Sequence, residues 1–142
     1  MTLLQTVQAI EAAAMAQPSV AMIVPNDVFR LNATPDARYG VFAWTQRQHT
    51  ADLEGDFTRF AFALFYVDRL TADRANELEI QSVGIQTLEA VLRELQDRGI
   101  FPEDGYTFDT FNQRFEDECA GVWCSVTFDV PVSPLCVNPD EI

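Results

Sequence analysis

The segment from Phe57 to Leu70 is the feature of this sequence that most restricts how the chain can fold. Its alternate positions carry one apolar set, Phe60, Phe62, Leu64 and Tyr66, and the positions between them carry a second set, Ala61, Ala63, Phe65 and Val67. Successive side chains of a β-strand point to opposite faces of its sheet, so this strand is apolar on both faces. A strand of this kind belongs at the centre of a sheet, and its apolar surface exceeds what helices on one side would cover.

Two helices are predicted, one on each side of this strand along the chain. The first spans Thr2 to Gln17, where apolar residues recur at intervals of three and four, and Thr2 can cap it. The second spans Asp73 to Arg98, carries an apolar stripe and is followed by Gly99, which favours a helix end. We predict Asp73 as the N-cap of the second helix, because an aspartate side chain readily accepts the first amide hydrogens of a helix.

Four shorter segments are predicted as strands. They are Ser19 to Val24, Tyr39 to His49, Tyr106 to Phe115 and Gly121 to Val130. The last two are expected to form a hairpin that bends around Asp117 to Gly121. The polar stretch from Thr50 to Asp56 is expected to be the exposed tip of another hairpin.

These elements indicate an α+β fold, a mixed and mainly antiparallel sheet with two helices on one face, in the order α-β-β-β-α-β-β. Residues 1–130 are expected to form this single domain. Residues 131–142 are rich in proline, which cannot donate to a strand ladder. We therefore expect them to form a Pro-rich C-terminal arm that docks on a neighbouring subunit or on a different protein.

Charge narrows the range of functions. The chain has 22 acidic and 9 basic residues, all of the latter arginine, and a net charge of −13. Such a surface repels phosphate, so specific nucleic-acid binding is not expected. High solubility alone would explain the charge, and the functional alternatives are a wall along which DNA passes and a mimic that docks on a basic partner. No apolar stretch approaches the roughly 20 residues of a membrane-spanning helix, and we expect neither export nor membrane binding.

No residue pattern points to catalysis, a metal or a cofactor. The cysteines Cys119, Cys124 and Cys136 and the histidine His49 could in principle supply four zinc ligands, but their spacing does not fit a compact zinc knuckle. Buried structural cysteines are the favoured interpretation, and no motif surrounds a Cys–His nucleophilic pair. A cluster of carboxylates fits a solvated corner better than an acid–base or cation site, and its members are Asp109, Glu116, Asp117 and Glu118. The prediction is a protein that is not an enzyme and holds no metal or cofactor.

An acidic and a basic residue, Asp68 and Arg69, stand where the central strand leaves the core. They can pair locally in the turn that follows. In the alternative interpretation, Arg69 makes a bidentate bridge to a carboxylate of a neighbouring subunit.

A scattered set of residues that includes this pair carries a resemblance to a known group of proteins. The set is Phe65-Tyr66-Val67-Asp68-Arg69-Leu70, Asn76, Ile80-Gln81-Ser82, Gly84, Leu88, Arg114-Phe115, Asp117, Cys119-Ala120-Gly121 and Trp123. It resembles small virion proteins of tailed bacteriophages, in particular the neck and tail-completion (tail terminator) group. The resemblance in element order runs from Thr2 to about Val130, transfers no fixed active residue, and does not place the segment from Pro131 to Ile142.

The resemblance implies a structural protein that forms a ring, with hexameric symmetry, at the head-tail junction or tail end of a phage. Its partners would be copies of itself and other neck or tail proteins, and genomic DNA would pass without specific binding. It would reside in the virion, and in the host cytoplasm during assembly. The resemblance leaves open whether the protein is a terminator, a head-side connector, a tube protein or a baseplate component.

Six residues are candidates for the contacts between subunits. Arg59, Asp68 and Arg69 would bridge neighbouring subunits, and the hairpin-tip carboxylates Asp52, Glu54 and Asp56 would reach a neighbouring ring. Two other functions remain open. One is an acidic binding module, such as an inhibitor or immunity protein, that docks on a basic partner. The other is an enzyme whose site forms only between subunits.

Overall fold

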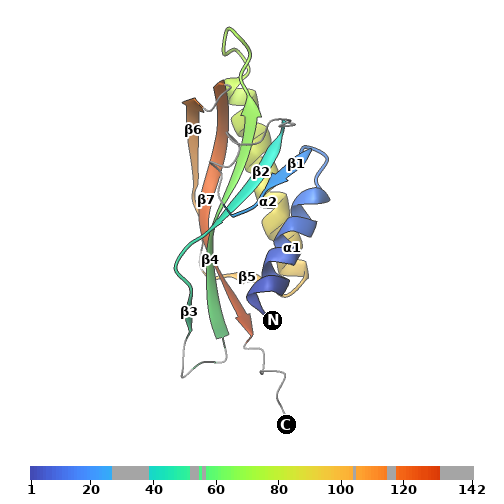
Figure 1. Ribbon diagram of the computed structural model, residues 1–142, viewed down its shortest axis with the longest axis vertical. Helices are drawn as coiled ribbons and strands as arrows, with labels where there is room; N and C mark the ends of the chain where they lie inside the picture. Colours follow the sequence, from blue (N-terminus) through green and yellow to red (C-terminus); the bar gives the residue numbers. More distant parts are fainter. Residues whose placement is uncertain (27–38, 52–54, 56, 104, 115–117, 132–142) are drawn as a thin grey trace.

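The computed structural model describes residues 1–26, 39–51, 55, 57–103, 105–114 and 118–131 (Figure 1). This part of the chain contains two helices, α1 (Leu3–Met15) and α2 (Glu77–Asp97). Its strands are β1 (Met22–Val24), β2 (Val41–Gln46), β3 (Thr50–Ala51), β4 (Phe57–Arg69), β5 (Phe101–Pro102), β6 (Phe108–Arg114) and β7 (Glu118–Pro131). Residues 132–142, the expected C-terminal arm, lie outside the described residues.

The described strands form one seven-stranded sheet in the order β1-β2-β4-β7-β5, with β3 beside β4 and β6 beside β7. All neighbouring strands are antiparallel except β1 and β2, which are parallel. Every residue of β4, from Phe57 to Arg69, is paired with a residue of β7. The α+β class and the central position of β4 are therefore confirmed. The strands β3 and β5, which the sequence analysis did not predict, have two residues each and are too short to show alternation.

Both helices pack on the same face of the sheet, as predicted (Figure 1). On that face, Phe62 and Leu64 of β4 are fully buried in one cluster with Ile10 of α1 and Leu88 of α2. Burying a side chain of this size contributes about 1.5–3 kcal/mol. This helix-covered core is the larger of the two hydrophobic clusters and holds most of the buried aromatic and leucine side chains.

The predicted cap of α1 is confirmed. The Thr2 hydroxyl accepts a hydrogen bond from the Gln5 amide (3.1 Å), and the Gln5 side chain accepts one from the Thr2 amide (2.9 Å). This reciprocal arrangement satisfies two backbone groups that would otherwise have no partner at the helix start.

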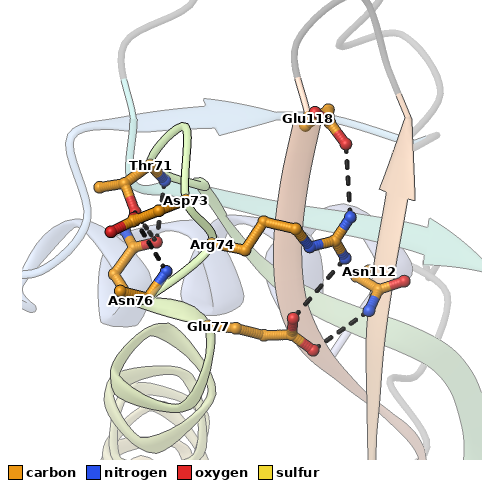
Figure 2. Close-up of polar contacts among 8 residues, drawn as sticks. Thr71, Asp73, Arg74, Asn76, Glu77, Asn112 and Glu118 are labelled. Atoms are coloured by element: carbon orange, nitrogen blue, oxygen red, sulfur yellow. Dashed lines mark hydrogen bonds and ion pairs between the residues drawn. The ribbon is translucent and has the colours of Figure 1, made fainter.

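The start of α2 differs from the prediction. Asn76 occupies the N-cap position, so Asp73 is not the cap. The Asp73 carboxylate instead accepts a hydrogen bond from the Thr71 hydroxyl (2.8 Å), within a turn that precedes the helix (Figure 2). Asn76 closes the same turn, because its Oδ1 accepts from the Thr71 amide (2.9 Å) and its Nδ2 donates to the Arg69 carbonyl (3.1 Å). Short polar side chains form hydrogen bonds with a nearby turn as readily as with the start of a helix. The Asp73 side chain bonds within the turn and therefore does not cap the helix.

Arg74 links this turn to the β6–β7 hairpin. Its backbone is left-handed, with φ of 60°, and its guanidinium lies between two carboxylates (Figure 2). Nη2 is 3.6 Å from an oxygen of Glu77, and Nη1 is 3.4 Å from an oxygen of Glu118. The Asn112 side chain of β6 donates to the other oxygen of Glu77 (3.1 Å). These side chains are exposed, and such pairs contribute about 0–1 kcal/mol each, so they mainly orient the connection.

The bend before β7 is shorter than predicted. Gly121, predicted as the last residue of the bend and the first of the strand, lies inside β7, opposite Val67 of β4 and Phe111 of β6. A Cβ at this position would overlap the Tyr66 carbonyl oxygen and would lie 2.7 Å from the Phe111 ring. Glycine is required here because neighbouring backbone and an aromatic ring fill the space, not because the chain turns. The predicted hairpin of β6 and β7 is confirmed, and residues 115–117 between the strands lie outside the described residues.

Replacing Gly121 with alanine should therefore destabilise the fold. The Gly121→Ala variant is expected to lose about 2–3 kcal/mol of unfolding free energy, since the clash is with backbone at the centre of the sheet. Urea unfolding followed by tryptophan fluorescence measures this loss. The matched control is Ser125→Ala on the same strand, at an exposed position, which should change stability by less than about 0.5 kcal/mol. Equal stability of the two variants would contradict the close approach.

Candidate functional site

The sheet face opposite the helices is the candidate functional surface. We call its central residues the helix-free face, and they are Thr45, Ala61, Ala63, Phe65, Phe111, Trp123, Ser125 and Thr127. These residues alternate with those that face the helices, and within the described residues no helix packs on them (Figure 1). None of these eight residues is charged, but Asp109 of β6, the cross-strand partner of Trp123, lies on the same face at an exposed position.

Three aromatic rings form the apolar centre of the helix-free face. Phe65 and Trp123 are cross-strand partners whose rings stack with centroids 6.0 Å apart. The Phe111 ring meets Phe65 nearly edge-on, with centroids 6.5 Å apart. All three side chains are only partly buried, although Val41 and Val67 beside them are fully buried. The second apolar side of the central strand, which the alternation predicts, thus retains accessible aromatic surface.

Arg59, a predicted interface residue, lies at one end of this sheet face. Its Nε is 2.6 Å from Glu103 Oε2 and 3.2 Å from Asp129 Oδ1, distances that make ion pairs, although the N–H direction is poor for a hydrogen bond. About a third of the Arg59 side chain remains exposed (33%). The exposed rings of Phe57 and Phe101 belong to the same end of the sheet. The charges at this end therefore partly neutralise one another within the chain.

Asp68 and Arg69 lie at the other end of β4. The Asp68 carboxylate accepts a hydrogen bond from the Arg69 amide (2.8 Å), which is a local contact. The Arg69 guanidinium lies over the ring of Tyr39, 5.0 Å from its centroid, in a cation–π contact. Burial, with a smaller effect of Asp68, raises the pKa of Tyr66 to about 12, so the phenol stays neutral. A bridge from Arg69 to a neighbouring subunit remains a prediction.

Of the six predicted interface residues, the structure describes Arg59, Asp68 and Arg69, and it does not bring Arg59 together with the other two. Arg59 and Arg69 are at opposite ends of β4. The carboxylates Asp52, Glu54 and Asp56 lie outside the described residues.

The two helices on the other side of the sheet, which we call the helix layer, present an acidic outer surface. Within α2 the charged residues are Glu77, Glu79, Glu89, Glu94 and Asp97, against Arg93 alone. A shallow hollow of about 480 Å³ lies between the end of α1 and α2, lined by Gln17, Gln86, Glu89, Ala90, Arg93, Glu94 and Asp97. Arg98 pairs with Glu94 beside it (2.9 Å). The lining offers polar, solvated groups but no nucleophile with a base beside it.

The cysteines do not form a common site. Cys119 and Cys124 are both fully buried, and because they are five positions apart on β7 they point to opposite faces of the sheet. Among the described residues, no group of three or more His, Cys, Asp or Glu side chains is arranged to hold a metal ion. Cys136 lies outside this part of the chain. In the same part, no helix is long and apolar enough to cross a membrane.

Comparison with known proteins adds no assignment. No protein-family model matches the chain, and no curated protein is significantly similar to it.

Sequence reasoning found the two apolar sides of β4 but missed how other residues are used. It did not identify the aromatic trio as a unit, because Phe65, Trp123 and Phe111 meet only through the register of β4, β6 and β7. It also missed Arg74 and Asn76 in the connection to α2. Asn76 belongs to the set of residues that carries the resemblance, and this was the one signal in the sequence that could have drawn attention to it.

The buried thiols lead to a direct chemical test. Burial raises the pKa of Cys124 to about 12, so its thiolate is scarce at pH 8, and Cys119 is equally inaccessible. In a Cys136→Ser variant, which removes the third cysteine, a thiol reagent such as Ellman's should react with neither thiol in the native protein and with both after unfolding. A thiol that reacts rapidly in the native variant would contradict the described burial.

Proposed function

We propose that this chain is a structural subunit that associates with copies of itself through the helix-free face and forms a ring at the head-tail junction or tail end of a tailed phage. The observation that carries the proposal is a partly exposed aromatic surface, with the carboxylate of Asp109 beside it, on the sheet of a strongly acidic protein. The phage setting comes from the sequence resemblance. No catalytic role is proposed.

The distribution of charge favours another copy as the partner of this surface. Two chains that each carry −13 repel one another, and this repulsion is weakest where the approaching surface holds no charge. The aromatic centre of the helix-free face has the carboxylate of Asp109 beside it, whereas α2 presents five acidic side chains against one arginine. The helix-free face therefore opposes association less than the outer surface of α2 does. Burying the rings of Phe65, Phe111 and Trp123 would add the hydrophobic gain that offsets the remaining repulsion.

A ring requires a head-to-tail interface, in which the helix-free face of one subunit meets a different surface of the next. The hexameric number comes from the resemblance, because a tail of that symmetry would impose it. In such a ring the acidic helix layer would face water or the channel. Carboxylates along a channel suit the passage of DNA, because they make none of the adhesive contacts that arginine and lysine make with phosphate.

The acidic helix layer supports a second candidate function. The side chains Glu89, Glu94 and Asp97 of α2 line an open hollow, and a basic protein could dock there. In this alternative the protein is a monomeric inhibitor or immunity-like module. The two functions use opposite faces of the molecule, so variants on each face separate them.

A charge placed on the helix-free face should weaken self-association. The Ser125→Glu variant adds a carboxylate at an exposed position next to Trp123 without removing any packed side chain. Self-association is expected to weaken by at least about tenfold, because the added charge must be desolvated against a like-charged neighbour. Sedimentation velocity over a concentration series measures the change.

The matched control adds the same charge to the helix layer. Gln86→Glu lies at an exposed position of α2 and should leave self-association unchanged. A protein that is monomeric at every concentration and absent from virions would contradict the ring. Weakening by Gln86→Glu alone would place the interface on the helices instead.

The salt dependence separates the two candidate functions. Screening reduces the repulsion between like-charged subunits, so raising NaCl from about 0.05 M to about 0.5 M should strengthen self-association. Docking of an acidic module on a basic partner should weaken over the same range. Light scattering across this range provides the measurement, and self-association that weakens with salt would contradict the proposed subunit contact.

A further inference from the structure

The only histidine of the chain, His49, occupies an irregularity in strand pairing. The β2–β4 ladder ends with Gln46 opposite Phe62, and the β3–β4 ladder begins with Thr50 opposite Arg59. Three residues, 47–49, therefore stand opposite only two, 60 and 61. One extra residue on one strand is the definition of a β-bulge, and a bulge interrupts the backbone hydrogen bonds of the ladder.

The His49 ring replaces the missing backbone acceptor at this bulge. Ala61 accepts a normal backbone hydrogen bond from the Arg47 amide (2.8 Å). In a regular ladder the Ala61 amide would donate back to the facing residue. Here it donates to His49 Nδ1 instead (3.1 Å). An imidazole nitrogen thus joins the β2–β4 and β3–β4 pairings into one continuous edge.

The hydrogen bonds fix the protonation state that this role needs. Because Nδ1 accepts, the neutral ring carries its proton on Nε2, which donates to Gln46 Oε1 (3.0 Å). Gln46 in turn donates to Asn26 Oδ1 (3.2 Å), at the end of β1. The ring also packs edge-on against Phe60, with centroids 5.4 Å apart, and at a tilt against Phe62, 5.7 Å apart. A second ring proton would set an N–H against the Ala61 N–H and remove this acceptor.

We propose that His49 is a proton-sensitive connector, whose protonation releases the hairpin formed by β3 and the first residues of β4 from the end of β2. This inference does not depend on ring formation, because every contact it uses lies within one chain.

Among the described residues, no carboxylate forms an ion pair with the His49 ring. The charged residues on the elements next to it have other places or partners. Arg47 is on the same connection, Arg59 lies on the opposite face of β4 with Glu103 and Asp129, and Glu11 of α1 accepts from Trp44 Nε1. Asp52, Glu54 and Asp56 lie outside the described residues. Burial lowers the pKa of His49 from its ordinary 6.5. The connector's contribution is therefore complete above about pH 6.5 and is lost as the pH falls through the lowered value.

Two measurements on the native protein test the proposal. The His49 ring, followed by NMR, should titrate below pH 6.5 and show the Nε2–H tautomer at neutral pH. The protection factor of the Ala61 amide against hydrogen exchange should fall by roughly fivefold to tenfold between about pH 7 and about pH 5. The amide of Val126, in the middle of the β4–β7 ladder, should keep its protection and serves as the internal control.

The decisive variant is His49→Asn, because the asparagine Oδ1 can take the place of Nδ1 as acceptor but cannot be protonated. Its Ala61 protection should be the same at both pH values. His49→Ala, which has no acceptor, should show low Ala61 protection at both. The proposal is overturned if the ring titrates at or above its ordinary pKa with unchanged Ala61 protection, or if His49→Asn retains the pH dependence of the wild type.

Discussion

The pairing of β4 with β7 is the interaction on which the rest of the structure depends. Every residue of β4 has a partner on β7, and both strands carry alternating side chains that must be covered on the helix side. This ladder positions Phe62, Leu64 and Val126 for the two helices and at the same time places Phe65 beside Trp123 on the other face. One backbone register thus creates both the stable core and the surface that remains available for association.

The contrast between the two sides of the sheet follows from where the charges are. The helices contribute carboxylates to their outer surface, and water solvates these at little cost, so the helix layer can carry most of the repulsive charge. On the helix-free face, the arginines stand at the ends, where Arg59 contacts two carboxylates and Arg69 lies over Tyr39. The centre holds the three aromatic rings, with Asp109 as the carboxylate beside Trp123. A protein with this distribution can be highly acidic and still present one surface on which a like-charged copy can rest.

The sequence predicted those features that depend on local pattern. The alternation in β4, the capping residue Thr2 and the hairpin of β6 and β7 were all correct, because each is expressed within a few neighbouring residues. The prediction of Asp73 as the N-cap was wrong, because its carboxylate accepts from the Thr71 hydroxyl and the Ala75 amide within the turn. The strand β7 begins at Glu118, before its predicted start at Gly121, and a glycine in the sequence does not reveal the ring of Phe111 above it. The aromatic trio and the role of His49 depend on register between distant strands, which no local pattern expresses. The predicted interface residues remain predictions.

Single-particle electron microscopy of the purified protein, at the salt concentration that favours association, tests the central claim most directly. We expect closed rings in which the helix-free face of each subunit is covered by its neighbour and the acidic outer surface of α2 faces solvent or the channel. Particles that are uniformly monomeric, or rings in which α2 is covered and Phe65 and Trp123 face solvent, would contradict it.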